Sequence, residues 1–136
     1  MKKILEPGLS GTSEITVSED MLACCVGSGL VEVFSTAMMI ARMEATAVAV
    51  VQDALPEGMT TVGTKVDVAH VAATPCGMQV TFIAELTGMT SNGKGLTFKV
   101  SARDEVGLIG EGVHERVVVH KEKFESRTRH RKDCGC

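Results

Sequence analysis

The sequence predicts an α+β fold in which a curved antiparallel sheet wraps one long central helix. Residues 30–55 contain no Gly or Pro and consist mainly of Ala, Met, Val and Ile. A strand could not use so long a stretch, whereas twenty helical residues span ~30 Å, about the width of a small domain. After Pro56 the pattern changes to an alternation of apolar and polar residues, which is typical of strands.

Composition limits the chain to one ordinary domain. It has 136 residues, of which 44% are hydrophobic and 23% charged. The longest apolar run, residues 45–51, is too short to cross a membrane, and Glu6 and Pro7 interrupt a start that otherwise resembles a signal peptide. We therefore expect no membrane partner. Five cysteines, an odd number, favour reduced thiols and a cytoplasmic location.

Charge and aromatic content argue against a nucleic-acid partner. The net charge is −3, and the chain has no Trp or Tyr on which bases could stack. Positive charge gathers only near the end, in RTRHRKDCGC. We expect a hot-dog-like domain over residues 1–124 and a basic, flexible tail over residues 125–136. His130, Cys134 and Cys136 are too weak a pattern to predict a metal site.

The elements follow in order. Residues 12–17 alternate enough for a first strand, and residues 18–29 read as a mobile connection ending in GSG. The helix is expected to begin near Ser35 or Thr36, either of which can cap its first turn. Four further strands are predicted over residues 60–69, 78–87, 96–102 and 108–119, with SNGKG (91–95) as a hairpin turn.

The predicted faces of these strands can be stated. In residues 60–69, one face carries Val62, Thr64, Val66 and Val68, and the other carries Thr61, Gly63, Lys65 and Asp67. Short connections make neighbouring strands antiparallel. A sheet with one apolar face must then curl around the helix, which is the hot-dog arrangement. Because one small sheet cannot cover a helix that is apolar on several sides, we expect a homodimer.

Glu44 is the first candidate for chemistry. It lies in the middle of the apolar helix, where an unpartnered carboxylate is costly, so it is paired, neutral or used. The structural alternative is an ion pair with Arg42 or Lys65, although Arg42 lies two residues away and points to a different side of the helix. At the helix start, Ser35 and Thr36 can cap the helix or help its N–H groups to meet an oxyanion.

Two further places carry histidine and arginine. His70 lies at a predicted strand end, followed by AATPCG; such a residue is often a surface histidine, but strand ends also position catalytic groups. The triplet His114–Glu115–Arg116 lies in the last strand, and it either faces water or offers the forked donor of Arg116 to a carbonyl or carboxylate.

Three blocks of the sequence resemble a known family. They are VEVFSTAMMIARMEATA, VGTKVDVAHVAATPCGMQVTFIAEL and GEGVHERVVVHKEKF, and they are similar to the hot-dog thioesterases related to fluoroacetyl-CoA thioesterase. The resemblance implies hydrolysis of an acyl-CoA thioester to the acid and free coenzyme A, with no cofactor and no metal. It implies catalytic roles for Thr36, Glu44 and His70 and acyl-group contacts for Gly63 and Arg116. Leu30 stands where the fluoroacetyl-specific members carry an aromatic residue, so the resemblance does not imply selectivity for a fluorinated acyl group. The small Ala, Gly and Thr residues around the candidate site fit a short acyl group.

Helix geometry adds one constraint to this reading. Thr36 and Glu44 are eight residues apart, or ~12 Å along a straight helix, so they cannot touch while both belong to it. Either Thr36 precedes the helix and folds back, or each site takes residues from two chains. Two other functions remain open: a non-catalytic module that binds acyl-CoA or an acyl carrier, and a hydratase using Asp67 with His70, although these two residues are expected on opposite faces.

Overall fold

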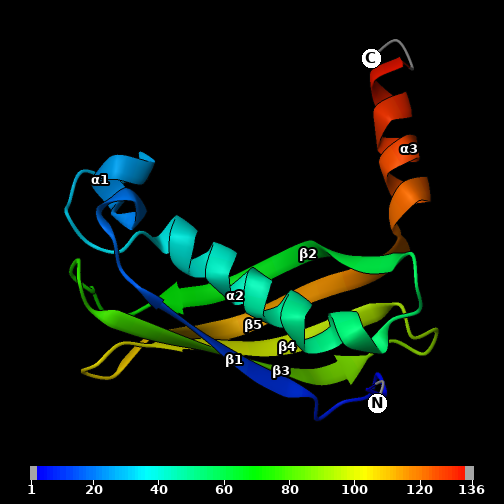
Figure 1. Cartoon of the computed structure of the whole chain (residues 1–136), viewed down its shortest axis with the longest axis horizontal. Helices are drawn as coiled ribbons and strands as arrows, with labels where there is room; N and C mark the ends of the chain where they lie inside the picture. The colour runs from blue at the N-terminus through cyan, green and yellow to red at the C-terminus, as the bar shows by residue number, and fades with distance from the viewer. Residues whose placement is uncertain (1–2, 134–136) are drawn as a thin grey trace.

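The computed structural model describes residues 3–133, and its element order matches the predicted fold class (Figure 1). The strands are β1 (Ser10–Thr16), β2 (Met59–His70), β3 (Gln79–Met89), β4 (Gly95–Arg103) and β5 (Leu108–His120). The helices are α1 (Ala23–Val26), α2 (Thr36–Val51) and α3 (Lys121–Asp133), with short 3-10 turns at Glu19–Met21 and Gln52–Ala54. No helix within residues 3–133 is long and apolar enough to span a bilayer.

The five strands form one antiparallel sheet in the order β1-β3-β4-β5-β2, and α2 crosses one face of it (Figure 1). The alternation predicted for β3 and β4 is confirmed, because every second residue is buried beneath α2. These residues are Val80, Phe82, Ala84, Leu86, Leu96, Phe98, Val100 and Ala102. They pack with Met39, Met43, Ala47, Val50 and Val51 of α2 in one hydrophobic core.

The start of α2 lies where the sequence predicts it. Ser35 is the N-cap residue, and its hydroxyl accepts a hydrogen bond from the backbone N–H of Met38 at 3.1 Å. Ser35 is fully buried, so this N–H could not find water instead. The cap fixes Thr36 as the first residue of the helix.

One face of α2 is left uncovered by its own chain. Ala37, Ala41, Ala45 and Ala49 recur every fourth residue and are all exposed. The helix is apolar on this side as well, as the sequence analysis expects of a helix that one chain cannot wrap.

The predicted faces of β2 are wrong for its first half. Gly63 pairs with Arg116 and Lys65 pairs with Glu115, so Thr64 is an extra residue that forms a β-bulge. Because a bulge shifts the alternation by one residue, Thr61 and Gly63 turn toward the helix instead of away from it. A glycine in a run of Thr, Val and Lys was the one local sign of this irregularity.

The chain ends differ from the expectation of a flexible tail. Residues 121–133 form α3, which continues from β5 and projects away from the sheet (Figure 1). Lys, Glu and Arg are good helix formers, which accounts for a helix with little apolar surface. Cys134 and Cys136 lie outside the described residues, and the domain boundary at residue 124 stays a prediction.

We predict that Ser35→Ala lowers the free energy of unfolding by ~1 kcal/mol or somewhat more, because it removes the cap and leaves a buried N–H unpaired. Urea denaturation of the purified protein measures the change. Ser91→Ala, in the exposed β3–β4 turn, is the control and should change stability by less than ~0.5 kcal/mol. Equal stability of Ser35→Ala and the parent would contradict this role of the cap.

Candidate active site

Thr36 and His70 form a hydrogen-bonded pair at one end of the sheet. The Oγ1 of Thr36 lies 2.7 Å from the Nδ1 of His70, so the first residue of α2 meets the last residue of β2. Thr36 is exposed and is followed by backbone N–H groups that a helix start leaves unpaired. A hydroxyl, an imidazole and free N–H groups therefore converge at one point.

The environment of His70 favours its neutral form. Burial lowers the pKa of His70 from its ordinary value of 6.5, and the nearby backbone of Ala72 opposes this only in part. Its Nε2 is buried and has no hydrogen-bond partner within residues 3–133. A neutral imidazole can accept the hydroxyl proton of Thr36 at Nδ1, and its Nε2–H is then left to donate to another group.

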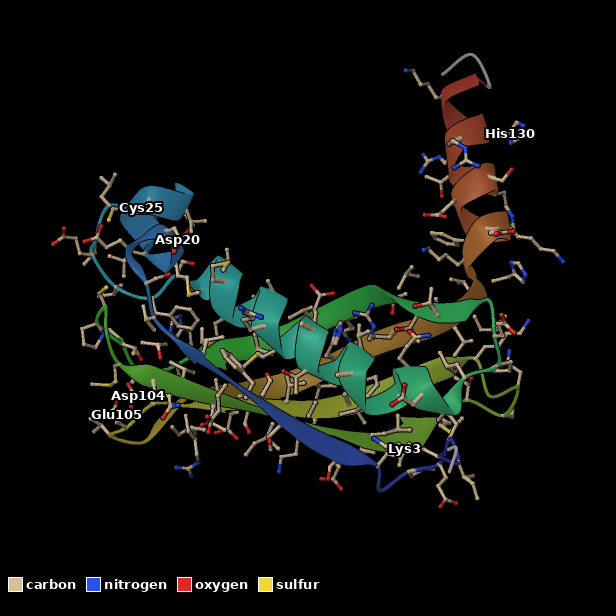
Figure 2. The ribbon with its side chains drawn as sticks, viewed as in Figure 1. Lys3, Asp20, Cys25, Asp104, Glu105 and His130 are labelled. Carbon is tan, nitrogen blue, oxygen red and sulfur yellow. The ribbon has the colours of Figure 1, made fainter. Side chains whose placement is uncertain are left out.

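The loop after His70 is tied to the entry of α2. The carbonyl of Thr74 accepts a hydrogen bond from the N–H of Phe34 at 2.8 Å, and the Thr74 hydroxyl donates to the Oδ2 of Asp104 at 2.8 Å. Figure 2 shows Asp104 in the β4–β5 turn, at the same end of the molecule as α1 with Cys25. Thr74 thus fixes both segments that carry the Thr36–His70 pair.

A cleft opens beside this pair. It has a volume of about 290 Å³, and small side chains line most of it, including Ala23, Ser28, Ala72 and Ala73 beside Thr36 and His70. The α1 segment forms one wall, although the sequence analysis treated residues 18–29 only as a mobile connection. The cleft can hold a compact acyl group against the hydroxyl of Thr36.

Glu44 belongs to a second cluster, built on α2, β2 and β5. Its Oε2 accepts a hydrogen bond from the Nη1 of Arg116 at 3.0 Å. Arg116 also donates from Nε to the Thr61 hydroxyl at 2.8 Å and from Nη2 to the Thr61 carbonyl at 3.0 Å. Burial lowers the pKa of Arg116, and the charge and hydrogen bond of Glu44 counter this effect. The guanidinium is thereby held almost fully buried while the Glu44 side chain stays 39% exposed.

Gly63 makes room for the Glu44 carboxylate. A Cβ atom at this position would lie 2.6 Å from the Oε2 of Glu44 and 3.3 Å from the Nη1 of Arg116. At 2.6 Å the carboxylate, which is the end of a flexible side chain, must move, so any side chain here displaces it. Glu44, Gly63 and Arg116, to which the family resemblance assigns roles, therefore lie together.

The ion pair considered in the sequence analysis exists with a different partner. Arg116 takes the place proposed for Arg42 or Lys65, and Lys65 lies 3.9 Å from Glu115 instead. Thr61 and His114 also contact this cluster and were not among the predicted site residues. The spacing of His114 and Arg116 was the available signal, because residues two apart in a strand share a face.

The five predicted residues thus form two groups within one chain: Thr36 with His70, and Glu44 with Gly63 and Arg116. No hydrogen bond joins the two groups in the described part of the chain. No cluster of three or more His, Cys, Asp or Glu residues that could hold a metal ion occurs within residues 3–133.

Comparison with known proteins identifies the family. The family model described as "FlK: Fluoroacetyl-CoA-specific thioesterase" matches residues 17–122. The chain belongs to this thioesterase family. The fluoroacetyl-CoA thioesterase of Streptantibioticus cattleyicolor is 42% identical over 104 residues, which cover 76% of this chain and 73% of that protein.

Solved structures agree with this assignment to the thioesterase family. A structure of the fluoroacetyl-CoA thioesterase FlK has a TM-score of 0.87 at 34% identity and covers 94% of this chain and 98% of that one. A thioesterase superfamily member from Thermus thermophilus has a TM-score of 0.86 at 30% identity, covering 98% and 96%. The predicted hot-dog fold and the predicted class, a thioester hydrolase, are confirmed.

We predict that Gly63→Ala lowers kcat by ~10²-fold, because the added methyl group pushes the Glu44 carboxylate aside, and displacements of ~1 Å have effects of this size. A thiol-release assay measures kcat, and thermal unfolding checks that the variant is folded. Gly107→Ala is the matched control, since a Cβ atom there meets nothing within 4 Å. Full activity of Gly63→Ala would show that the carboxylate position is unimportant.

Proposed function

We propose that this thioesterase hydrolyses a short-chain acyl-CoA to the free acid and coenzyme A, without a cofactor or a metal. The observation that carries the proposal is the Thr36–His70 hydrogen bond at the start of α2, inside a cleft lined by small side chains. The related enzyme from Streptantibioticus cattleyicolor is named for a two-carbon acyl group, which agrees with a compact cleft. The cytoplasmic location stays a prediction.

In the proposed mechanism the thioester carbonyl lies at the N-terminus of α2. The N–H groups of Thr36 and Ala37 stabilise the oxyanion as it develops. His70 Nδ1 removes a proton from the attacking hydroxyl, which belongs either to Thr36 or to a water molecule that Thr36 orients. The C–S bond then breaks, and the proton passes from His70 to the coenzyme A thiolate. Water completes the reaction where an acyl group has formed on Thr36.

We further propose that each active site uses two chains of a homodimer, with Glu44 supplied by the partner chain. Three features of one chain support this. The Glu44 side chain is 39% exposed, so a second chain can approach it. The twelve-residue strand β2 lies at the sheet edge, where a second β2 can pair with it about a two-fold axis. The exposed alanine face of α2 permits close approach of a second helix.

The other candidate functions make different demands. A module that only binds acyl-CoA does not need a hydroxyl bonded to an imidazole, so the Thr36–His70 pair speaks against it. A hydratase using Asp67 needs that carboxylate near His70. Asp67 lies three residues from His70 in an extended strand and is exposed, which leaves the two side chains on opposite faces.

A thiol-release assay with acyl-CoA substrates of two to twelve carbons tests the proposed reaction. We expect turnover that is highest for the shortest chains, and a ~10²-fold or larger fall in kcat for His70→Ala, the scale of a lost acid–base group. Tight acyl-CoA binding without thiol release would instead establish a binding module. His130→Ala, on the projecting helix α3 (Figure 2), is the control.

A heterodimer of two inactive variants tests the two-chain site. Thr36→Ala and Glu44→Gln chains with different affinity tags are co-expressed, and the mixed dimer is purified. If sites are shared, one of its two sites has both wild-type residues, and we expect about half of wild-type activity. If each site is contained in one chain, every site carries a substitution and the mixed dimer stays as inactive as either parent.

A further inference from the structure

His114 lies behind the Glu44–Arg116 pair in the middle of β5, and its side chain is only 1% exposed. Its Nδ1 is 2.8 Å from the Lys65 carbonyl, and its Nε2 is 3.1 Å from the Nη1 of Arg116. The Glu44 Oε2 is 3.8 Å from the same Nε2. The ring also stacks on Phe98, with centroids 6.3 Å apart. Every polar atom of this buried imidazole is therefore engaged.

These two contacts determine the protonation of the ring. A carbonyl oxygen only accepts hydrogen bonds, so Nδ1 must carry a proton to bond with Lys65. A guanidinium group only donates, so Nε2 must be without a proton to bond with Arg116. In this arrangement His114 donates to the Lys65 carbonyl of β2 and accepts from Arg116.

The hydrogen bond from His114 to the Lys65 carbonyl is important because of where Lys65 lies on β2. Lys65 directly follows Thr64, the extra residue of the bulge, and Gly63 directly precedes it. A Cβ atom on Gly63 would lie 3.3 Å from the Cε1 of His114, so the ring also borders the space that the glycine leaves for Glu44. By bonding to both Lys65 and Arg116, His114 fixes the separation between the bulge of β2 and Arg116. This separation keeps the space beside Gly63 open for the Glu44 carboxylate.

The hydrogen bonds of Arg116 show what His114 adds. A guanidinium has five N–H groups. Thr61 accepts from Nε and Nη2, and these bonds fix the plane of the group. Nη1 has two N–H groups; one meets Glu44 and the other meets His114. Without His114, the second N–H of Nη1 would lose the acceptor that it has in this buried space.

We propose that His114 is a positioning residue, whose imidazole fixes Arg116 Nη1 and through it the Glu44 carboxylate above Gly63. This inference rests on the proposal that Glu44 of one chain belongs to the active site of the other. It assigns His114 no contact with the substrate. It differs from a role in packing alone, in which the ring would serve only to fill space against Phe98.

A pair of substitutions separates these two roles. His114→Phe keeps the ring and its stacking but removes both polar atoms, whereas His114→Gln keeps a donor and an acceptor and loses the ring. We expect His114→Phe to lower kcat by ~10- to 100-fold with little change in KM, the effect of a displaced catalytic group. We expect His114→Gln to restore most of that loss. His120→Phe, further along the same strand, is the control and should keep full activity.

A double substitution tests whether His114 acts through Glu44. In the Glu44→Gln background, His114→Phe should cause little further loss of kcat, because the group that it positions is already gone. Losses that multiply would overturn the proposal, as would a His114→Phe enzyme more active than His114→Gln. Thermal unfolding is measured for every variant to separate these effects from loss of the fold.

A measurement without turnover keeps this inference distinct from the proposed function. In NMR spectra of the wild-type protein, we expect separate Nη–H signals for Arg116, because its guanidinium cannot rotate freely, and a proton on Nδ1 of His114. His114→Gln should retain the separate Arg116 signals. A freely rotating Arg116 in the wild-type protein would overturn the proposal even if His114→Phe did not fold. Failure to release thiol from any acyl-CoA would overturn the proposed function alone.

Discussion

The rise of an α-helix separates the two functional groups of this protein, and the remaining architecture follows from that separation. Thr36 and Glu44 both belong to α2, a helix of 16 residues, so the hydroxyl and the carboxylate lie about two turns apart. The sheet therefore supplies a different partner to each of them: the end of β2 brings His70 to Thr36, and β5 brings Arg116 to Glu44. If the active site needs both groups, as proposed, a two-fold axis is the simplest operation that brings one from each chain together.

Much of this arrangement is readable from the sequence because it depends on local patterns. The alternation in β3 and β4, the Ser35 cap and the absence of helix breakers each concern residues close together in the chain, and the structure confirms all three. The pairing of Thr36 with His70 was reached through family resemblance rather than through the patterns themselves. No local rule connects residues that are 34 positions apart.

The incorrect predictions, which concern the faces of β2 and the partner of Glu44, have a different cause. The bulge at Thr64 depends on how β2 pairs with β5, and its effect is to turn Thr61 and Gly63 inward against the simple alternation. Once Thr61 faces inward, it can hold Arg116, and Arg116 can reach a glutamate 72 positions away. The sequence analysis considered Arg42 and Lys65 instead, although Arg42 points to a different side of the helix from Glu44. Pairing register is a tertiary property, so Gly63 alone could not show where the bulge lies or which residues it turns inward.

The proposed burial of Glu44 by a second chain gives a reason for the many hydrogen bonds of Arg116. In one chain the carboxylate is 39% exposed and can still be solvated, whereas Arg116 is 7% exposed. A second chain that covers this face removes water from both charges, and an unpaired buried charge is much more costly than a paired one. Thr61, His114 and Glu44 together accept hydrogen bonds from four of the five N–H groups of Arg116. These bonds keep the guanidinium in place as water leaves. On this argument Arg116 serves first to fix the position of Glu44, and one Nη2 N–H remains for the acyl-group contact that the family resemblance implies.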